Sequence, residues 1–181
     1  MRKKVSTGRL ALIAVMAAVI SVSAFISIPF AGVPITMQLF GVYLALFILG
    51  GRGGSAAVLL YISIGALGLP VFSGFSGGIG RLVDATGGFI FGFIILALVY
   101  WCLTSILPSG RAYSIISAVI STIVLYFVGA LWYSVVFLGG IVYFLEAVLC
   151  TVLPFIAFDV VKIFLAVICK DLLKKQLHIT D

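Results

Sequence analysis

The stretch LALIAVMAAVISVSAFISI, residues 10–28, decides the fold class of this chain. It contains no charged residue and is long enough to cross a bilayer as an α-helix, which takes roughly 17–25 mostly apolar residues. Arg2, Lys3 and Lys4 precede it, as in a secretory signal, but the run exceeds the usual ~7–15 apolar residues of a signal and further apolar runs follow. We therefore expect the first of several transmembrane helices, with its basic end in the cytoplasm.

The composition of the whole chain also indicates a membrane protein. Of its 181 residues 64% are hydrophobic and 9% are charged, whereas about 25% are charged in an average soluble domain. A soluble domain of this size has too little interior to bury so much apolar surface. We therefore expect a single domain embedded in the lipid bilayer over residues 1–181, and we exclude a soluble enzyme, a nucleic-acid-binding protein and a disordered chain.

The apolar segments and the positions of the basic residues predict the topology. The candidate spans are residues 10–28, 35–50, 54–70, 87–107, 113–131 and 154–173. Six spans with a cytoplasmic N-terminus place every Lys and Arg except Arg81 and Lys162 on the inner side, whereas a seventh span at 132–153 would place the last bases outside. We predict an all-α bundle of six transmembrane helices with both termini cytoplasmic, in which 132–153 is an outer loop or a re-entrant segment.

Two charged residues, Asp159 and Lys162, lie inside the last predicted helix. A charge at the bilayer centre costs about 2.5–3.5 kcal/mol on insertion scales, so both side chains should face protein or a cavity. Their spacing of i and i+3 places them on one helix face. One possibility is that the two charges neutralise each other and serve only to hold the helix in place. We favour a polar site near the outer end of the helix, where Lys162 donates hydrogen bonds to a small polar solute and Asp159 accepts them.

Three further candidates for contact with a solute lie in or beside the predicted outer loops. The glycine-rich stretch VFSGFSGGIGRLVDATGG, residues 71–88, could cover a cavity with Arg81 pointing inward, or could be a hairpin that packs helices closely. Gln38 follows the first outer loop and could bond a solute or a neighbouring backbone group. Tyr143 lies in the segment 132–153, whose aromatic residues could line a ligand or form an interfacial belt.

Several kinds of chemistry have no support in the sequence. The single histidine, His178, lies in the C-terminal tail, which excludes a His-based metal site or a His-assisted serine nucleophile in the bundle. The three cysteines lie apart in apolar stretches without CxxC spacing, which predicts packing and no metal site. A Walker motif is missing. A small membrane enzyme that uses Asp84 and Glu146 as acid and base is an alternative, although no nucleophile accompanies them.

Several stretches resemble the BioY family, the substrate-binding S components of energy-coupling factor (ECF) biotin transporters. They are VPITMQLFGVYLA, GGRGGSAAVLLYISIGALGLPVFSGFSGGIG, TGGFIFGF and VLPFIAFDVVK, in family order and within residues 33–166. The GALGLPVF-to-TGG block and the LPF…D-x-x-K ending are the specific parts. The resemblance implies six helices, an extracytoplasmic biotin pocket, and docking onto a transmembrane T component with two ATPase subunits in a bacterial inner membrane. ATP would then be used by the partner subunits only, and no cofactor or metal is expected in this chain.

The resemblance also implies roles for individual residues. The D-x-x-K pair falls on Asp159 and Lys162, and the polar ligand contact of the glycine-rich loop falls near Arg81. Asp159 would accept a hydrogen bond from a ureido N–H of biotin, while Lys162 and Arg81 would donate to its ureido carbonyl and its carboxylate, in either assignment. The AxxxA docking pattern of S components falls on Ala14 and Ala18, a small-xxx-small pair that lets another membrane helix approach closely.

The chain departs from the family at one turn and leaves other solutes possible. Asp84-Ala85 stands where the family commonly has Gly-Pro before T-G-G, which we expect to loosen the turn and add a charge. Whether Asp84 pairs with Arg81 is open at this point. The alternatives to a biotin S component are an S component for another vitamin-like solute, the small membrane enzyme, and a solitary carrier without ATPases.

Overall fold

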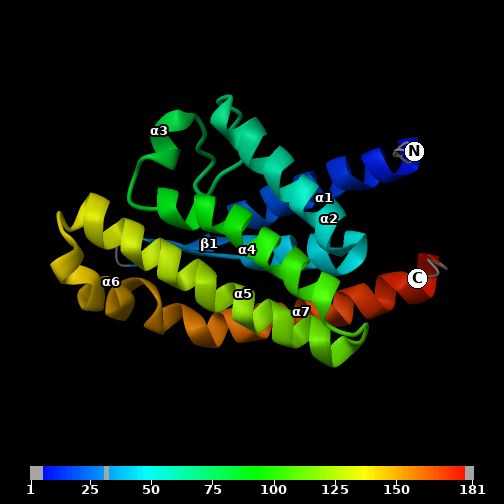
Figure 1. Cartoon of the computed structure of the whole chain (residues 1–181). Helices are drawn as coiled ribbons and strands as arrows, with labels where there is room; N and C mark the ends of the chain where they lie inside the picture. The colour runs from blue at the N-terminus through cyan, green and yellow to red at the C-terminus, as the bar shows by residue number, and fades with distance from the viewer. Residues whose placement is uncertain (1–5, 31–32, 178–181) are drawn as a thin grey trace.

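The computed structural model describes residues 6–30 and 33–177, and within this part the chain is mainly helical (Figure 1). Arg2, Lys3, Lys4 and His178 lie outside the described residues. The elements in chain order are α1 (Thr7–Phe25), β1 (Ser27–Ile28), β2 (Ile35–Thr36), α2 (Gln38–Ala66), α3 (Ile79–Leu82), α4 (Gly87–Ile106), α5 (Arg111–Trp132), the π-helical turn η1 (Tyr133–Phe137), the 3-10 turn η2 (Ile141–Tyr143), α6 (Phe144–Thr151) and α7 (Leu153–Leu177). The two short strands pair antiparallel, with Ser27 opposite Thr36.

The long helices pack side by side and give the molecule two distinct ends (Figure 1). The start of α1 and the end of α7 lie at one end, together with the turn between α4 and α5. The short elements α3 and α6 lie at the opposite end, with the connections that the sequence predicts to be outer loops. The α2 helix contacts α1, α4 and α7. It is the central helix, because 17 of its 29 residues are buried, compared with 5 of 19 in α1.

Helix α2 is two helical segments that meet at Gly50. The backbone angles of Gly50, φ 72° and ψ 171°, lie in a region that essentially only glycine adopts. The chain changes direction there, and the segments before and after Gly50 run along different lines (Figure 1). The predicted spans 35–50 and 54–70 imply a loop between them, at the glycine run of residues 50–54. Instead the helix resumes at Gly51, where a Cβ would lie 2.6 Å from Cα of Trp101, so α2 and α4 cross closely.

Four described helices are long and apolar enough to cross a membrane, and a fifth span results if α6 and α7 are taken together. The four are Thr7–Phe25, Gln38–Ala66, Gly87–Ile106 and Arg111–Phe137, and α6 meets α7 at an angle of 51°. The chain is therefore a multi-pass membrane protein. The count differs from the predicted six because α2 covers most of both predicted spans 35–50 and 54–70. The segment 132–153 contains η1, η2 and α6.

Candidate binding site

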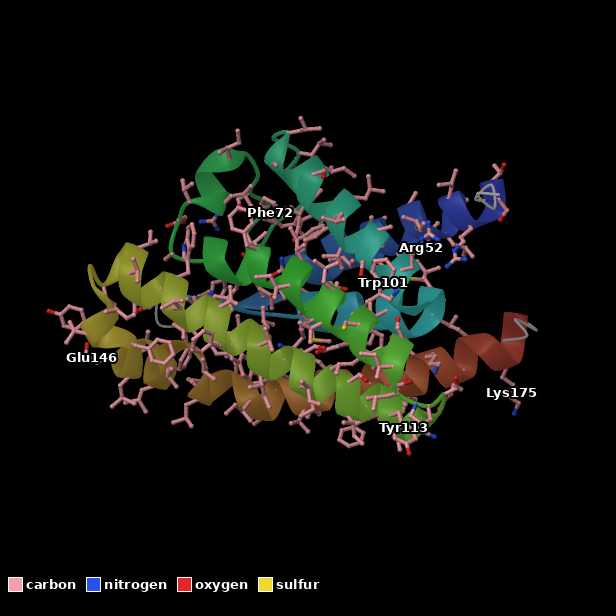
Figure 2. The ribbon with its side chains drawn as sticks, in the orientation of Figure 1. Arg52, Phe72, Trp101, Tyr113, Glu146 and Lys175 are labelled. Carbon is pink, nitrogen blue, oxygen red and sulfur yellow. The ribbon has the colours of Figure 1, made fainter. Side chains whose placement is uncertain are left out.

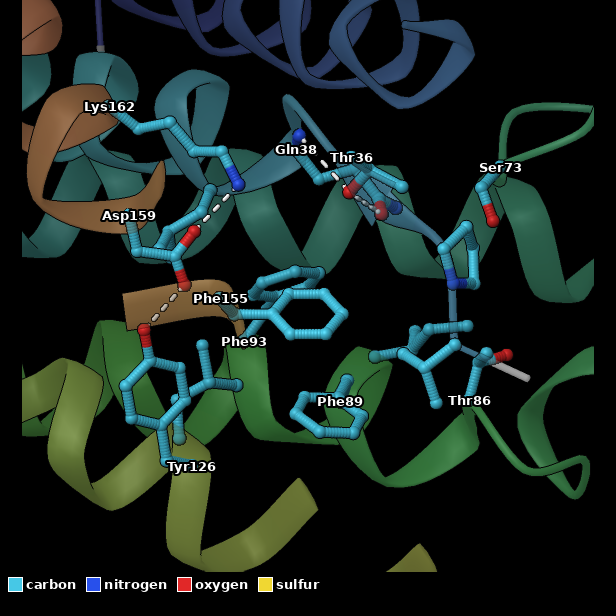
Figure 3. Close-up of a pocket in the computed structure, with 15 residues that line it drawn as sticks. Thr36, Gln38, Ser73, Thr86, Phe89, Phe93, Tyr126, Phe155, Asp159 and Lys162 are labelled. Atoms are coloured by element: carbon cyan, nitrogen blue, oxygen red, sulfur yellow. Dashed lines mark hydrogen bonds and ion pairs between the residues drawn. The ribbon is translucent and has the colours of Figure 1, made fainter. Parts of the chain in front are cut away.

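A cavity of about 60 Å³ lies among α2, α4, α5 and α7 (Figure 3). Asp159 and Lys162 lie at one end of it, and Ser73 and Thr86 lie at the other. The cavity is small compared with the roughly 300–1,000 Å³ of typical small-molecule sites. Entry of a drug-sized ligand therefore requires its walls to move apart.

Asp159 and Lys162 form a buried ion pair on α7. Their exposed fractions are 5% and 4%, and Nζ of Lys162 donates to Oδ1 of Asp159 at 2.6 Å. The hydroxyl of Tyr126 on α5 donates to the other carboxylate oxygen at 2.6 Å. Both carboxylate oxygens thus have a donor, while the ammonium group has three N–H groups and uses one of them on Asp159. Asp159 and Lys162 therefore present a hydrogen-bond acceptor and a hydrogen-bond donor side by side at the cavity, the arrangement that the sequence predicts for a solute site.

Gln38 lines the cavity at the start of α2 and is held by two neighbours. The hydroxyl of Thr36 donates to Oε1 of Gln38 at 2.7 Å (Figure 3). Nε2 of Gln38 donates to the hydroxyl of Tyr61 at 2.6 Å. These bonds fix the orientation of the amide and leave it one more N–H for a ligand. The structure therefore brings Gln38, Asp159 and Lys162 to one cavity.

Aromatic rings form the middle of the cavity. Phe89 and Phe93 of α4 and Phe155 of α7 lie between its two polar ends (Figure 3). Phe93 and Phe155 are buried, with 6% and 8% of their surface exposed. An apolar middle with polar groups at each end suits an elongated ligand that is itself polar at both ends.

Arg81 does not line this cavity and instead ties the glycine-rich loop together. Its guanidinium donates to Oγ of Ser76 at 2.8 Å, to Oδ2 of Asp84 at 2.8 Å and to the carbonyl oxygen of Ser73 at 3.4 Å. Ser73 lines the cavity, so the bond from Arg81 to its carbonyl connects Arg81 to the cavity wall. The ion pair between Arg81 and Asp84, open from the sequence, is formed.

Hydrogen bonds hold the turn at Asp84, whereas the sequence suggested a looser turn. The other carboxylate oxygen of Asp84 accepts from the backbone N–H of Ala85 at 2.7 Å. The indole N–H of Trp132 donates to the backbone carbonyl of Asp84 at 2.9 Å. The aspartate supplies bonds through its side chain and its backbone at this turn.

Tyr143 lies in η2 and is 42% exposed, and it does not line the cavity. The tyrosine that the cavity contains is Tyr126, which sequence reasoning missed. Tyr126 lies in an apolar helix without a motif of its own, and only the helix packing brings its hydroxyl to Asp159. Ala14 and Ala18 lie exposed on α1, where a partner helix could reach them.

The residues of the enzyme alternative do not meet at this site. Asp84 is bonded to Arg81, Glu146 is exposed on α6, and neither lines the cavity. Within residues 6–30 and 33–177, no group of three or more His, Cys, Asp or Glu side chains could hold a metal ion.

Comparisons with known proteins agree on one family. A model of the BioY family matches residues 1–178. The chain is 39% identical to the probable biotin transporter BioY of Pyrococcus horikoshii over 164 residues, which span 90% of this chain and 94% of the relative. It is 38% identical to the biotin transporter BioY of Thermotoga maritima over 162 residues, which span 89% and 92%. The crystal structure of the S-component for biotin from an ECF-type ABC transporter matches with a TM-score of 0.79 and 28% identity, over 93% of this chain and 91% of that chain.

Proposed function

This chain belongs to the BioY family, and we propose that it is the biotin-binding S component of an ECF-type ABC transporter. Its relatives are named as transporters, so it is a transport protein and not an enzyme. The observation that carries the proposal is the buried Asp159–Lys162 pair at one end of an aromatic cavity.

Biotin matches the order of groups along this cavity. Its ureido ring has N–H donors and a carbonyl acceptor, its middle is an apolar thiolane with a valeryl chain, and its other end is a carboxylate. We place the ureido ring at Asp159 and Lys162, because a carboxylate accepts from N–H groups and would repel the acid of the ligand. The apolar middle would then lie against Phe89, Phe93 and Phe155.

The carboxylate of biotin would face Ser73 and Thr86 in this arrangement. Thr86 precedes the first residue of α4, where the positive end of the helix dipole favours negative charge. Arg81 is committed to Ser73, Ser76 and Asp84, so it would support the loop over the carboxylate and contact biotin only if the loop rearranged. We infer that this loop, between α2 and α4, moves outward when the ligand enters.

We also propose a topology and a set of partners for this chain. The break at Gly50 supports counting α2 as two spans, which together with α1, α4, α5 and α7 would give six helices with cytoplasmic termini. Residues 1–181 would form one substrate-binding domain in a bacterial inner membrane. Ala14 and Ala18, exposed on α1, would dock onto a T component that two ATPase subunits drive. This chain would use no cofactor.

Uptake of labelled biotin by cells without a biotin transporter tests this function. We expect uptake when the chain is expressed with a T component and two ATPases, and none when the ATPases carry inactive Walker motifs. Unlabelled biotin should compete, and other vitamins should not. Competition only by another vitamin would identify a different solute, whereas ATPase-independent uptake in cells lacking every partner would identify a solitary carrier.

A docking variant provides the matching control. Replacing Ala14 and Ala18 with Leu should abolish uptake while the purified variant still binds biotin, because bulky side chains keep the partner helix away. Unchanged uptake by this variant would mean that the T component docks elsewhere.

A further inference from the structure

A second cavity, of about 750 Å³, lies at the end of the molecule that holds the start of α1 and the end of α7. It is bordered by the turn at Gly50 and by the α4–α5 connection at Pro108, Ser109 and Gly110. It shares no lining residue with the cavity at Asp159. The proposed transport function gives this second cavity no role.

The charges of this second cavity favour an anion. Arg9 of α1, Arg111 of α5 and Lys170 of α7 line it with one acid, Asp171, so three cations less one anion give a formal net charge of +2. Arg111 pairs with Asp171 at 3.3 Å, but both side chains are about half exposed or more, at 64% and 47%, so this pair is weak. Among the described residues, no carboxylate lies within 4.0 Å of Arg9 or Lys170.

The backbone adds to the positive potential. Helix α5 starts at Arg111, after Gly110, and no side chain caps its first N–H groups. The second segment of α2 starts at Gly51, which also lines the cavity. Unpaired N–H groups at a helix start favour anions such as phosphate, and at the start of α5 they reinforce the side-chain cations.

The rest of the wall is partly apolar, with Thr104, Ser109 and Ser114 beside the apolar side chains, and its apolar part reaches the surface of the molecule. Leu12 on α1 and Tyr113 on α5 line the cavity and are each 40% exposed. Lys170 lies over the buried ring of Phe47, with Nζ 6.0 Å from the ring centre, so its charge is held at the boundary of the apolar wall. Tyrosine is typical of the membrane–water interface, and Figure 2 shows Tyr113 at the end opposite Glu146. The cavity therefore places cations beside exposed apolar surface.

We propose that this cavity binds the headgroup phosphate of an anionic phospholipid of the surrounding bilayer, with Arg9 and Lys170 as its main contacts. A basic pocket between transmembrane helices at the cytoplasmic side is a recognised kind of site for anionic headgroups. A lipid accounts for both the basic and the apolar parts of the wall. Its phosphate contacts the cations, and the part of its acyl chains nearest the headgroup lies against Leu12 and Tyr113. Bound there, it links the turn at Gly50 to the start of α5 and stabilises that end of the molecule.

Thermal unfolding of delipidated protein in detergent tests the proposal. Phosphatidylglycerol, phosphatidylcholine or inorganic phosphate is added at matched concentration, and native mass spectrometry counts the lipids that stay bound. The variant Arg9→Gln/Lys170→Gln is compared with Arg52→Gln/Lys175→Gln, which removes the same charges from exposed residues that do not line the cavity. Figure 2 shows Arg52 and Lys175 at the same end as Tyr113.

We expect phosphatidylglycerol to raise the unfolding midpoint of the wild type and of the Arg52/Lys175 variant alike. The Arg9/Lys170 variant should lose most of that shift and its bound lipid, and phosphatidylcholine and phosphate should have little effect on any of the proteins. An equal shift in both variants would overturn the proposal in favour of general surface charge. An equal effect of inorganic phosphate would overturn it in favour of a soluble anion. If phosphatidylglycerol has no effect and the Arg9/Lys170 variant binds a T component more weakly, the cavity is a protein-docking surface and the proposal is wrong.

Discussion

Tyr126 on α5 donates a 2.6 Å hydrogen bond to Oδ2 of Asp159 on α7. The other oxygen of the carboxylate accepts from Lys162, so donors from two helices fix its orientation before any ligand arrives. Such preorganisation favours binding, because the ligand does not have to order the group that holds it. The site therefore depends on how α5 and α7 pack as much as on the D-x-x-K spacing.

The ion pair predicts a specific pattern of stability. Lys162→Met or Asp159→Asn alone should destabilise the protein by about 3–5 kcal/mol, since removing one partner of a buried pair leaves the other charge uncompensated. The double variant should be less destabilised than the worse single variant, because it buries no unpaired charge. Thermal unfolding in detergent without biotin measures this cycle. Additive losses would show that the two charges are not coupled.

Two tyrosines offer a matched comparison for ligand binding. Tyr126→Phe removes the donor to Asp159 and should weaken biotin binding by up to about tenfold, because biotin must then order a carboxylate that is no longer fixed in advance. Tyr143→Phe should leave the affinity unchanged, because Tyr143 lies outside the cavity. Isothermal titration with biotin compares them. The reverse order would restore Tyr143 as the contact and reject the arrangement described above.

The sequence indicated those residues of the cavity that differ from their surroundings. Asp159 and Lys162 are charged residues in an otherwise apolar helix, so the cost of burying them pointed to a cavity without any knowledge of the fold. Gln38 was found for a similar reason, as a polar residue at the start of an apolar run. The positions of α1, α4, α5 and α7 followed from the lengths of the apolar segments.

The missed features depend on packing or on single backbone angles. Tyr126 is one of seven tyrosines and lies 33 positions before Asp159, so nothing local marks it as the partner. The run of glycines at 50–54 suggested a loop, but only Gly50 leaves the helical conformation. The spacing of Arg81 and Asp84 allowed an ion pair but did not show whether the guanidinium faces the cavity or the loop.

The loop contacts predict the kinetics of release. If Arg81 acts by holding the loop, Arg81→Gln and Asp84→Asn should each speed biotin dissociation by a similar factor, about two- to fivefold, since partly exposed ion pairs contribute ~0.2–1 kcal/mol. Chase experiments with labelled biotin measure the rate. A direct contact between Arg81 and biotin would appear as loss of binding in Arg81→Gln with no change in Asp84→Asn.

Alanine substitutions at Gly50 and Gly8 distinguish the cost of backbone strain from the cost of a steric clash. A Cβ at either position would meet no atom within 4 Å, so substitution introduces no clash. Gly50→Ala should destabilise the protein by about 1–3 kcal/mol, because alanine must adopt a conformation that is essentially restricted to glycine. Gly8→Ala, in the first turn of α1, should be neutral or slightly stabilising. Equal unfolding midpoints would contradict the strained turn at Gly50.

The measurement that tests the central claim most directly is equilibrium binding of biotin to the purified protein and to the Asp159→Asn/Lys162→Met variant. Size-exclusion chromatography confirms that both proteins are folded before the titration. We predict saturable binding of one biotin per chain by the wild type, and a loss of affinity of about 100-fold or more in the variant, from two lost hydrogen bonds to charged groups. Equal affinity in the two proteins, or no binding by the wild type, would contradict the assignment of the cavity at Asp159 and Lys162 as the biotin site.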